Sequence, residues 1–381
     1  MICFSAAGKA DRLWDVLVVG AGVAGAMAAY GAARRGLSVL LIDKAAFPRG
    51  KACGCCLNQA AVLLLEEAQF NIRALGATPL DRFYLACGGT TAKIPIPSGL
   101  AISREVLDMA LINHAQNVGA AFMPRTTAQA TAAFSTHREV SVVQDGIVGS
   151  VRAKIVLVAD GLGGRLLRAD DGLEIAANSR VGIAGMLEYP TQGYAPGIIY
   201  MACGKRGYAG LVTVENQRLH IAAALDVHAA RDAAGAANAL AEIIRDSGLP
   251  VPAGLPACRW HGAPALTRHR SRLFETRLFV LGDSAGYVEP FSGEGMAWAL
   301  AGAKRILPLL EQAVTEWRDE LGLQWQKQFR KLVGSRHRTC RAVTLVLRNR
   351  AITRLAVEAL KMSPGLAGPL VRQINRPVAM A

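Results

Sequence analysis

The stretch DVLVVGAGVAGAMAAYGAARRGLSVLLID, residues 15–43, decides the fold. A short apolar run leads into Gly20, Gly22 and Gly25, and a second apolar run ends at Asp43. We expect strand, helix and strand, with Gly20 in the tight turn, Gly22 where backbone approaches a pyrophosphate, and Gly25 where helix packs on strand. The carboxylate that follows the second strand can accept from ribose hydroxyls. The pattern therefore predicts a Rossmann-like dinucleotide site. We expect Ala24 and Lys44, which lie next to these residues in the sequence, to belong to the same site.

Two later stretches distinguish FAD from NAD. VLVADGLGGRLLR (156–168) and RLFVLGDSAGYVEPFSGEGMAWALAGAKR (277–305) resemble the second and third signatures of the FAD-dependent superfamily of p-hydroxybenzoate hydroxylase-like aromatic-ring monooxygenases and geranylgeranyl reductases. The resemblance implies that Asp283, in the pair Gly282-Asp283, binds the ribityl chain of FAD. It also implies that Asp160-Gly161 lies in a loop that serves flavin and pyridine nucleotide. This chain departs from the pattern, with Gly164 in place of the superfamily's Ser and the next Arg at 165 or 168.

The third stretch also has a reading that rests on its residues alone. A loop ends at the residues that open an apolar helix from Met296 to Ile306, so several backbone N–H groups and a positive helix end face the same place. A flavin ring that becomes anionic on reduction suits that arrangement. These residues therefore join the predicted FAD site: Pro290, Gly293, Glu294, Gly295 and Met296.

The stretch FPRGKACGCCLN (47–58) is similar to the segment Phe-Pro-Arg-x-Lys-x-Cys-Gly of geranylgeranyl-reductase-type flavoproteins. Arg104, in ISREVLDMAL, matches the arginine that packs at the flavin in that family, and Tyr208, in RGYAGLV, resembles an aromatic residue of its substrate sheet. The final segment has a weaker resemblance, to flavoproteins found with bacterial type III polyketide synthases. These matches imply an FAD enzyme that acts on a small apolar substrate.

The cluster Cys53, Cys55 and Cys56 has three readings. Zinc needs four ligands, and no second Cys/His pair of regular spacing completes Cys53 and Cys56, so we predict no metal. A redox pair is an alternative, because a CxxC near a helix start favours thiol exchange. We favour a third reading, in which small side chains let the loop pass over the flavin, with Cys53 near the ring.

The order of the motifs predicts an α/β chain of 381 residues with a discontinuous Rossmann-like FAD-binding domain. Alternating short apolar runs between the second and third signatures predict an antiparallel substrate sheet above the flavin. The expected units are the FAD-binding domain at 11–48, 100–175 and 270–325; the flavin-covering loop and substrate domain at 49–99 and 176–269; and a basic helical C-terminal segment at 326–381.

Most of the net charge of +14 lies in that last segment. From Lys327 onward there are twelve Lys or Arg residues and one acid, Glu358. An amphipathic helical tail of this kind suits an anionic membrane surface or an acidic partner, and equally a helix that caps the domain with its apolar face. No nucleic-acid recognition motif accompanies the charge, so no nucleic acid is expected. The chain has no apolar run of about 18 residues, and its eight cysteines form no regular framework, which favours a cytoplasmic location.

Two enzyme activities fit these observations, both with NAD(P)H as the expected reductant of FAD. The first is oxygen-dependent hydroxylation of a phenolic or polyketide-like substrate, which the sequence favours; the alternative is reduction of isoprenoid double bonds. A redox-responsive flavin-binding protein without turnover is a remoter alternative, and halogenation ranks low because the halogenase WxWxIP signature is absent. The candidate catalytic residues are Cys53, Tyr208 and His261, and for His261 a structural role is the stronger expectation.

Overall fold

The computed structural model describes residues 12–164, 166–167, 172–232, 235–289, 291 and 293–376, without the side chains of 230–232. Three residues named above, Arg165, Arg168 and Pro290, lie outside the described residues.

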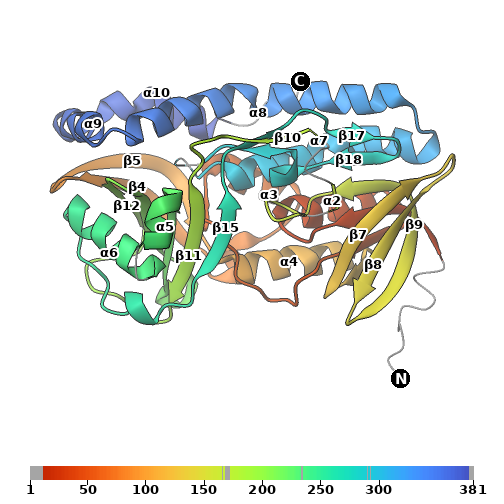
Figure 1. Cartoon of the computed structure of the whole chain (residues 1–381), viewed down its shortest axis with the longest axis horizontal. Coiled ribbons are helices and arrows are strands. Elements are labelled where there is room, and N and C mark those ends of the chain that lie inside the picture. Colours follow the sequence, from red (N-terminus) through yellow and green to blue (C-terminus); the bar gives the residue numbers. More distant parts are fainter. Residues whose placement is uncertain are drawn as a thin grey trace.

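The first eight-stranded sheet, here called the Rossmann sheet, contains the motif strands (Figure 1). Its central strand β1 (Leu13–Val19) lies between β2 (Val39–Ile42) and β9 (Ile147–Val158), parallel to both. The others are β6 (Ala121–Met123), β7 (Thr126–Ala133), β8 (Arg138–Gln144), β17 (Phe274–Glu275) and β18 (Leu278–Val280). Val16, Leu17 and Val18 are fully buried, as expected for the middle strand of a covered parallel sheet.

The helix that follows β1 is α2 (Val23–Ala33), which packs against α4 (Arg104–Gln116) and α7 (Gly295–Thr315). All its residues are buried, which explains the run of Ala and Gly: small side chains let neighbouring helices approach closely. At Gly25 a β-carbon would overlap the carbonyl oxygen of Gly20, so the spacing of these two glycines is a steric requirement. Further helices that precede α7 are α3 (Gln59–Glu67), α5 (Val227–Asp232) and α6 (Ala236–Ser247).

The second eight-stranded sheet, here called the substrate sheet, has the order β15-β11-β14-β13-β12-β4-β5-β3. Its strands are β3 (Cys56–Leu57), β4 (Thr78–Cys87), β5 (Thr90–Ala101), β11 (Val181–Leu187), β12 (Ile198–Gly204), β13 (Gly207–Thr213), β14 (Leu219–Leu225) and β15 (His261–Ala265). The prediction of an antiparallel sheet is wrong for one pair, because β12 runs parallel to β4. These two strands are joined through the Rossmann sheet rather than by a hairpin, so the chain returns in the same direction.

Three helices form a layer along one side of the molecule, at the top of Figure 1. They are α8 (Asp319–Leu347), α9 (Arg350–Met362) and α10 (Gly368–Asn375), and we call them the helical layer. Helix α8 packs on β17 and β18 and α9 packs on β4 and β5, so the layer bridges both sheets. Trp325, fully buried, donates from its indole N–H to the carbonyl of Val280 over 3.0 Å.

The architecture confirms the predicted fold class, with a Rossmann-like sheet, a second sheet and a helical C-terminal segment. A third, small sheet of β10 (Leu173–Ile175), β16 (Arg268–Arg270) and β19 (Gly286–Tyr287) joins them. The division into three units with the boundaries given above stays a prediction. Among the described helices, none combines the length and the apolar character that a membrane crossing requires.

Candidate flavin site and its two cavities

The N-terminus of α2 has no side-chain cap, so no capping side chain accepts from the backbone N–H groups of its first turn. The loop before it is held by Asp43, whose Oδ2 accepts from the backbone N–H of Ala21 and whose Oδ1 accepts from that of Ala45, both over 2.8 Å. This carboxylate therefore fixes the glycine turn. Its predicted contact with ribose stays a prediction.

Two guanidinium groups face this uncapped helix start. A β-carbon placed on Gly22 would lie 3.5 Å from Nη2 of Arg104 and 3.8 Å from Nη2 of Arg49. Arg104 forms a bidentate pair with Asp108 over 2.8 and 2.9 Å, and Arg49 lies 3.5 Å from the same carboxylate. Backbone N–H groups, a helix dipole and two fixed cations are the donors that a pyrophosphate takes, so these residues fit the diphosphate of FAD.

The predicted Gly282-Asp283 pair lies directly against the same helix. Gly282 has a φ of +57°, and a β-carbon there would lie 2.8 Å from Cβ of Ala24. Asp283 pairs with Lys51 over 3.6 Å, which connects this turn to the loop that carries the cysteines. The first and third signatures, more than 250 residues apart in the sequence, therefore meet at one place.

The loop of the second signature is held by Ser284. Its hydroxyl donates to Oδ1 of Asp160 over 2.9 Å and accepts from the backbone N–H of Gly161 over 2.7 Å. A β-carbon on Gly164 would overlap the Asp160 carboxylate, which explains why this chain has glycine where the superfamily has serine. Lys44 donates to the carbonyl of Gly163 over 3.2 Å and so closes the same loop against β2.

The cysteine loop combines thiols of opposite character. A hydrogen bond with the Cys55 thiol, together with the charge of Arg104, lowers the pKa of Cys53 to about 5, although burial acts in the other direction. Burial and the negative charge of Cys53 raise the pKa of Cys56 to about 12. One thiolate and one firmly protonated thiol therefore lie three positions apart at neutral pH.

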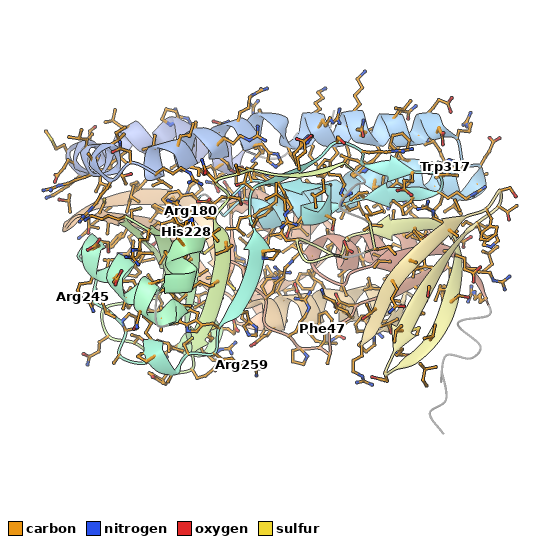
Figure 2. The ribbon with its side chains drawn as sticks, in the orientation of Figure 1. Phe47, Arg180, His228, Arg245, Arg259 and Trp317 are labelled. Carbon is orange, nitrogen blue, oxygen red and sulfur yellow. The ribbon has the colours of Figure 1, made fainter. Side chains whose placement is uncertain are left out.

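A cavity of about 560 Å³, the polar cavity, opens on one side of this loop. Its lining includes Arg49, Lys51, Cys55 and Arg104, and two histidines from the substrate sheet, His220 and His261. Arg259, which also lines it, and Phe47 lie on the side of the molecule away from the helical layer (Figure 2). Burial lowers the pKa of His220 to about 4, so this imidazole is neutral at pH 7.

A second cavity of about 480 Å³, the apolar cavity, lies on the other side of the loop, between the substrate sheet and the helical layer. Most of its lining is aliphatic or aromatic. The contributing side chains include Leu80, Phe83, Leu85, Ile94, Ile96, Ile199, Met201, Val212, Phe291, Val343, Leu360, Leu366, Leu370, Val371 and Ile374. The polar groups in its lining include Cys56, Asn58, Glu294 and Cys340.

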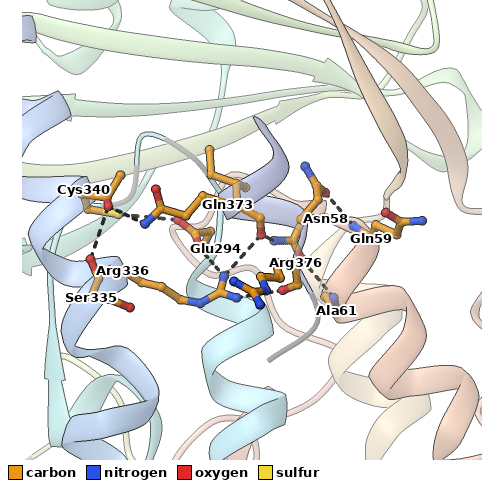
Figure 3. Close-up of polar contacts among 12 residues, drawn as sticks. Asn58, Gln59, Ala61, Glu294, Ser335, Arg336, Cys340, Gln373 and Arg376 are labelled. Carbon is orange, nitrogen blue, oxygen red and sulfur yellow. Dashed lines mark hydrogen bonds and ion pairs between the residues drawn. The ribbon is translucent and has the colours of Figure 1, made fainter. Parts of the chain in front are cut away.

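Asn58, Glu294 and Cys340 belong to a network between α10 and the loop before α7 (Figure 3). Arg336 donates to Oε1 of Glu294 over 2.7 Å and to the backbone carbonyls of Ile374 and Arg376. Asn58, the cap of α3, donates to the same Ile374 carbonyl over 2.9 Å. Glu294 is buried and paired with this arginine, and the flavin contact predicted for it stays a prediction.

The structure does not bring the three candidate catalytic residues together. Cys53 lies in the loop beside Arg104, and His261 lines the polar cavity, with its ring against the backbone of Gly50. Tyr208 is buried in the substrate sheet, 5.2 Å from the ring of Phe291 between centroids and 5.6 Å beneath the guanidinium of Arg180. Burial and the charge of Glu289 raise the pKa of its hydroxyl well above the usual range.

Sequence reasoning did not single out five residues that shape this site: Arg49, Lys51, Asp108, Ser284 and Arg336. A signal existed for three of them. Arg49 and Lys51 are the basic positions of the quoted cysteine-loop motif, and Asp108 lies four residues after Arg104, where a helix brings side chains together. Ser284 and Arg336 have no such signal, because their partners come from distant parts of the chain.

Comparisons with known proteins agree with this geometry. The profile of the FAD binding domain family matches residues 14–338. Menaquinone reductase of Mycobacterium tuberculosis (strain ATCC 25618 / H37Rv) is 37% identical over 160 residues, which span 40% of this chain and 38% of that protein. Digeranylgeranylglycerophospholipid reductase 1 of Methanopyrus kandleri is 25% identical over 83% of this chain and 84% of its own length. Conditioned medium factor receptor 1 of Dictyostelium discoideum is 23% identical over 80% of this chain, which spans only 65% of that relative.

Solved structures share the fold at low sequence identity. The p-nitrophenol 4-monooxygenase PnpA of Pseudomonas putida has a TM-score of 0.76 at 16% identity, covering 95% of this chain and 98% of that one. The myxobacterial chondrochloren halogenase CndH has a TM-score of 0.75 at 16% identity, over 95% and 90% of the two chains. With its three signatures gathered around one helix start and its family match over most of its length, this chain belongs to the FAD binding domain family.

Proposed function

We propose that this chain is an FAD-dependent oxidoreductase that reduces carbon–carbon double bonds in a long isoprenoid chain. The observation that carries the proposal is the apolar cavity, whose walls are mostly aliphatic and whose polar groups include Glu294 and Asn58. A hydrocarbon chain gains about 0.8 kcal/mol for each methylene group that leaves water, so such a wall selects for chain length. The sequence alone favoured hydroxylation, and the shape of this cavity reverses that preference.

The relatives support the same substrate class. Menaquinone reductase and digeranylgeranylglycerophospholipid reductase are both named as reductases, and the second name specifies geranylgeranyl groups, which are isoprenoid chains. Menaquinone reductase aligns over only 38% of its length. The reaction and substrate are therefore proposals for this chain.

The chain's own residues have separable roles in this reaction. The start of α2, Arg49 and Arg104 would hold the diphosphate of FAD, and Asp283 its ribityl chain. When bound, reduced FAD would supply a hydride to one carbon of the double bond, and a proton from water would go to the other carbon. The apolar cavity orients the chain and excludes water from its length, and the loop from Gly54 to Cys56 separates that chain from the polar cavity. We propose NAD(P)H as the electron donor, since Arg259 in the lining of the polar cavity provides a further cation for a second phosphate-bearing ligand.

Hydroxylation of a phenolic ring is the second candidate. It is favoured by the polar groups of the apolar cavity, where Glu294 and Asn58 could accept a hydrogen bond from a phenol. An alkyl chain on that phenol would occupy the same aliphatic walls. The two candidates therefore predict similar binding and differ in their need for oxygen.

The test is a single turnover with dithionite-reduced enzyme under nitrogen. Geranylgeranylated glycerophospholipid and menaquinone serve as reductase probes, and a long-chain alkylresorcinol serves as the phenolic probe. A mass gain of two hydrogen atoms that fragmentation places in the isoprenoid chain, after reoxidation of any quinol, supports double-bond reduction when it occurs without oxygen. A product that appears only in air and carries one added oxygen atom overturns that proposal in favour of hydroxylation. Absence of both a reduced and an oxygenated product with every probe, in nitrogen and in air, contradicts both activities.

A further inference from the structure

The outer face of the helical layer has an unusual concentration of exposed apolar side chains. Fourteen large apolar residues are exposed in the described part of the chain, and six of them lie between positions 345 and 366. They are Leu345, Val346, Ile352, Leu355, Met362 and Leu366. Single exposed apolar residues are ordinary on protein surfaces, but a contiguous group marks a contact site.

On α9 these residues follow helical spacing. Ile352, Leu355, Ala359 and Met362 recur at intervals of three and four residues and are all exposed, with Leu355 70% and Met362 87% exposed. The inner face of the helix is separate, because Thr353 and Val357 are buried against the substrate sheet. Helix α9 therefore has two apolar faces, and only the inner one is used by the fold.

Cations border the outer stripe. Arg354, Lys361 and Arg372 are exposed, and none of them pairs with a carboxylate among the described residues. Glu358, the single acid of the segment, is turned inward and accepts from Thr90 over 2.6 Å. Side chains that end in nitrogen project outward along the whole layer (Figure 2). The stripe is thus apolar at its centre and positive at its edges.

The mouth of the apolar cavity lies in the same surface. Ala359 and Leu366 both line the cavity and are exposed. Ala356 and Leu360, next to Ala359 on the helix, line the cavity from inside. A hydrocarbon chain that approached through this face would pass from one apolar surrounding into another without crossing water.

We propose that the stripe on α9 and the turn that follows it dock on an anionic lipid bilayer, from which the substrate chain enters the apolar cavity beside Ala359 and Leu366. An apolar centre buries itself in the acyl boundary, and the bordering cations bind anionic headgroups. The docking surface stands on the exposed residues alone, whereas the entry of substrate rests on the function proposed above.

The test is sedimentation of the full chain with vesicles of phosphatidylglycerol or of phosphatidylcholine. The chain binds the anionic vesicles, and binding falls as salt rises. Replacing two stripe residues, Leu355→Glu with Met362→Glu, lowers the partition coefficient by roughly tenfold or more, since two apolar anchors are lost and two negative charges are added. The matched control, Phe134→Glu with Val148→Glu, adds the same charge at two exposed apolar positions remote from the layer and leaves binding nearly unchanged.

A second pair of variants tests the charge. Arg354→Gln with Lys361→Gln weakens binding to anionic vesicles, whereas Arg73→Gln with Lys205→Gln, at exposed positions elsewhere, has a smaller effect. Equal loss in test and control variants, or no binding of the unmodified chain to phosphatidylglycerol, overturns the proposal. So does a dimer in light scattering that Leu355→Glu with Met362→Glu dissociates, because a second copy would then cover the stripe.

Activity separates this proposal from the one before it. With a short-chain substrate in solution, the Leu355→Glu, Met362→Glu variant keeps its turnover, and with substrate embedded in vesicles it loses turnover in proportion to lost binding. Vesicle binding without turnover on any probe would leave the docking surface intact and remove the proposed reaction. Turnover without vesicle binding would support the proposed reaction and overturn the proposed docking surface.

Discussion

The two cavities are separated by a few residues of one loop, but one has a polar lining and the other an apolar lining. Cys55 lines the polar cavity, and its neighbours Gly54 and Cys56 line the apolar one. The lining of the first cavity contains guanidinium, ammonium and imidazole groups and the carboxylates of Glu105 and Glu188, and that of the second is mostly aliphatic. The loop thus acts as a partition between a region suited to phosphates and a region suited to hydrocarbon. Because Gly54, Cys55 and Cys56 have small side chains, a single stretch of backbone can separate the two cavities.

We expect the largest effect from a variant that removes the buried guanidinium of Arg104 beside the polar cavity. Arg104→Met leaves Asp108, which is fully buried, without its bidentate partner. We expect the free energy of unfolding to fall by about 3–5 kcal/mol, as for other broken buried pairs. Urea denaturation measures it. The double variant Arg104→Met with Asp108→Leu should recover much of the lost free energy of unfolding. If Arg104→Met alone lowers that free energy by less than about 1 kcal/mol, the buried ion pair of Arg104 and Asp108 does not stabilise the fold as proposed.

On the apolar side, Gly210→Leu narrows the cavity. A β-carbon at this position of β13 would lie 3.4 Å from the flexible end of Met201, so the side chain has room to enter. We expect kcat/KM for a long-chain substrate to fall about tenfold, the equivalent of about 1.4 kcal/mol, while FAD binding is unchanged. Gly262→Leu, at an exposed strand position with open space around it, is the matched control. If both variants lower kcat/KM equally, the apolar cavity does not bind the substrate.

The partition itself can be followed through its thiols. Alkylation of Cys53 by iodoacetamide should rise through a midpoint near pH 5, whereas Cys56 stays unmodified at pH 7 because its pKa is raised to about 12. Since the folded pKa of Cys53 is lowered, its contribution to stability is complete above the unfolded pKa of about 8.5 and is lost as the pH falls towards 5. Peptide mass spectrometry measures both sites. In the Arg104→Met variant the Cys53 midpoint should move upward, and an unchanged midpoint would exclude the guanidinium as a cause.

The smallest effect concerns His220 in the polar cavity. In the folded chain burial lowers the pKa of the His220 imidazole to about 4. As the pH falls, this imidazole is therefore protonated near pH 6.5 in the unfolded chain but only near pH 4 in the folded chain. Stability should therefore be complete above pH 6.5 and decline as the pH falls to 4. Replacing the ring, as in His220→Leu, should flatten this part of the pH profile in thermal melts. A profile that keeps its slope would assign the protonation to another group.

The sequence was sufficient for the parts of the site that depend on short spacing. Gly20, Gly22, Gly25 and Asp43 lie within one strand–helix–strand unit, and their geometry follows from the lengths of its elements. The Gly282-Asp283 pair could be placed only by resemblance, because nothing local says that Gly282 will lie against Ala24.

Other features could not be read from the chain. The parallel pairing of β12 with β4 depends on how the chain returns through the Rossmann sheet, which strand patterns do not encode. The pairing of Glu294 with Arg336 joins a loop to a helix 42 residues later, at no helical or strand spacing. The basic tail was recognised as amphipathic, but only the structure separates its inner face, with Val357, from its outer face, with Leu355.

The central position of β1 has a consequence for how the protein is made. Strand β9 pairs with β1 on one side through Val156 and Leu17, and with β18 on the other through Val156 and Leu278. On that side β8 already pairs with residues 147–153 of β9, but residues 156–158 stay unpaired during synthesis until the ribosome has passed residue 280. An open edge of this kind invites pairing with other chains, so a truncated product that ends before β18 should aggregate, and the nascent chain should depend on chaperones over that interval.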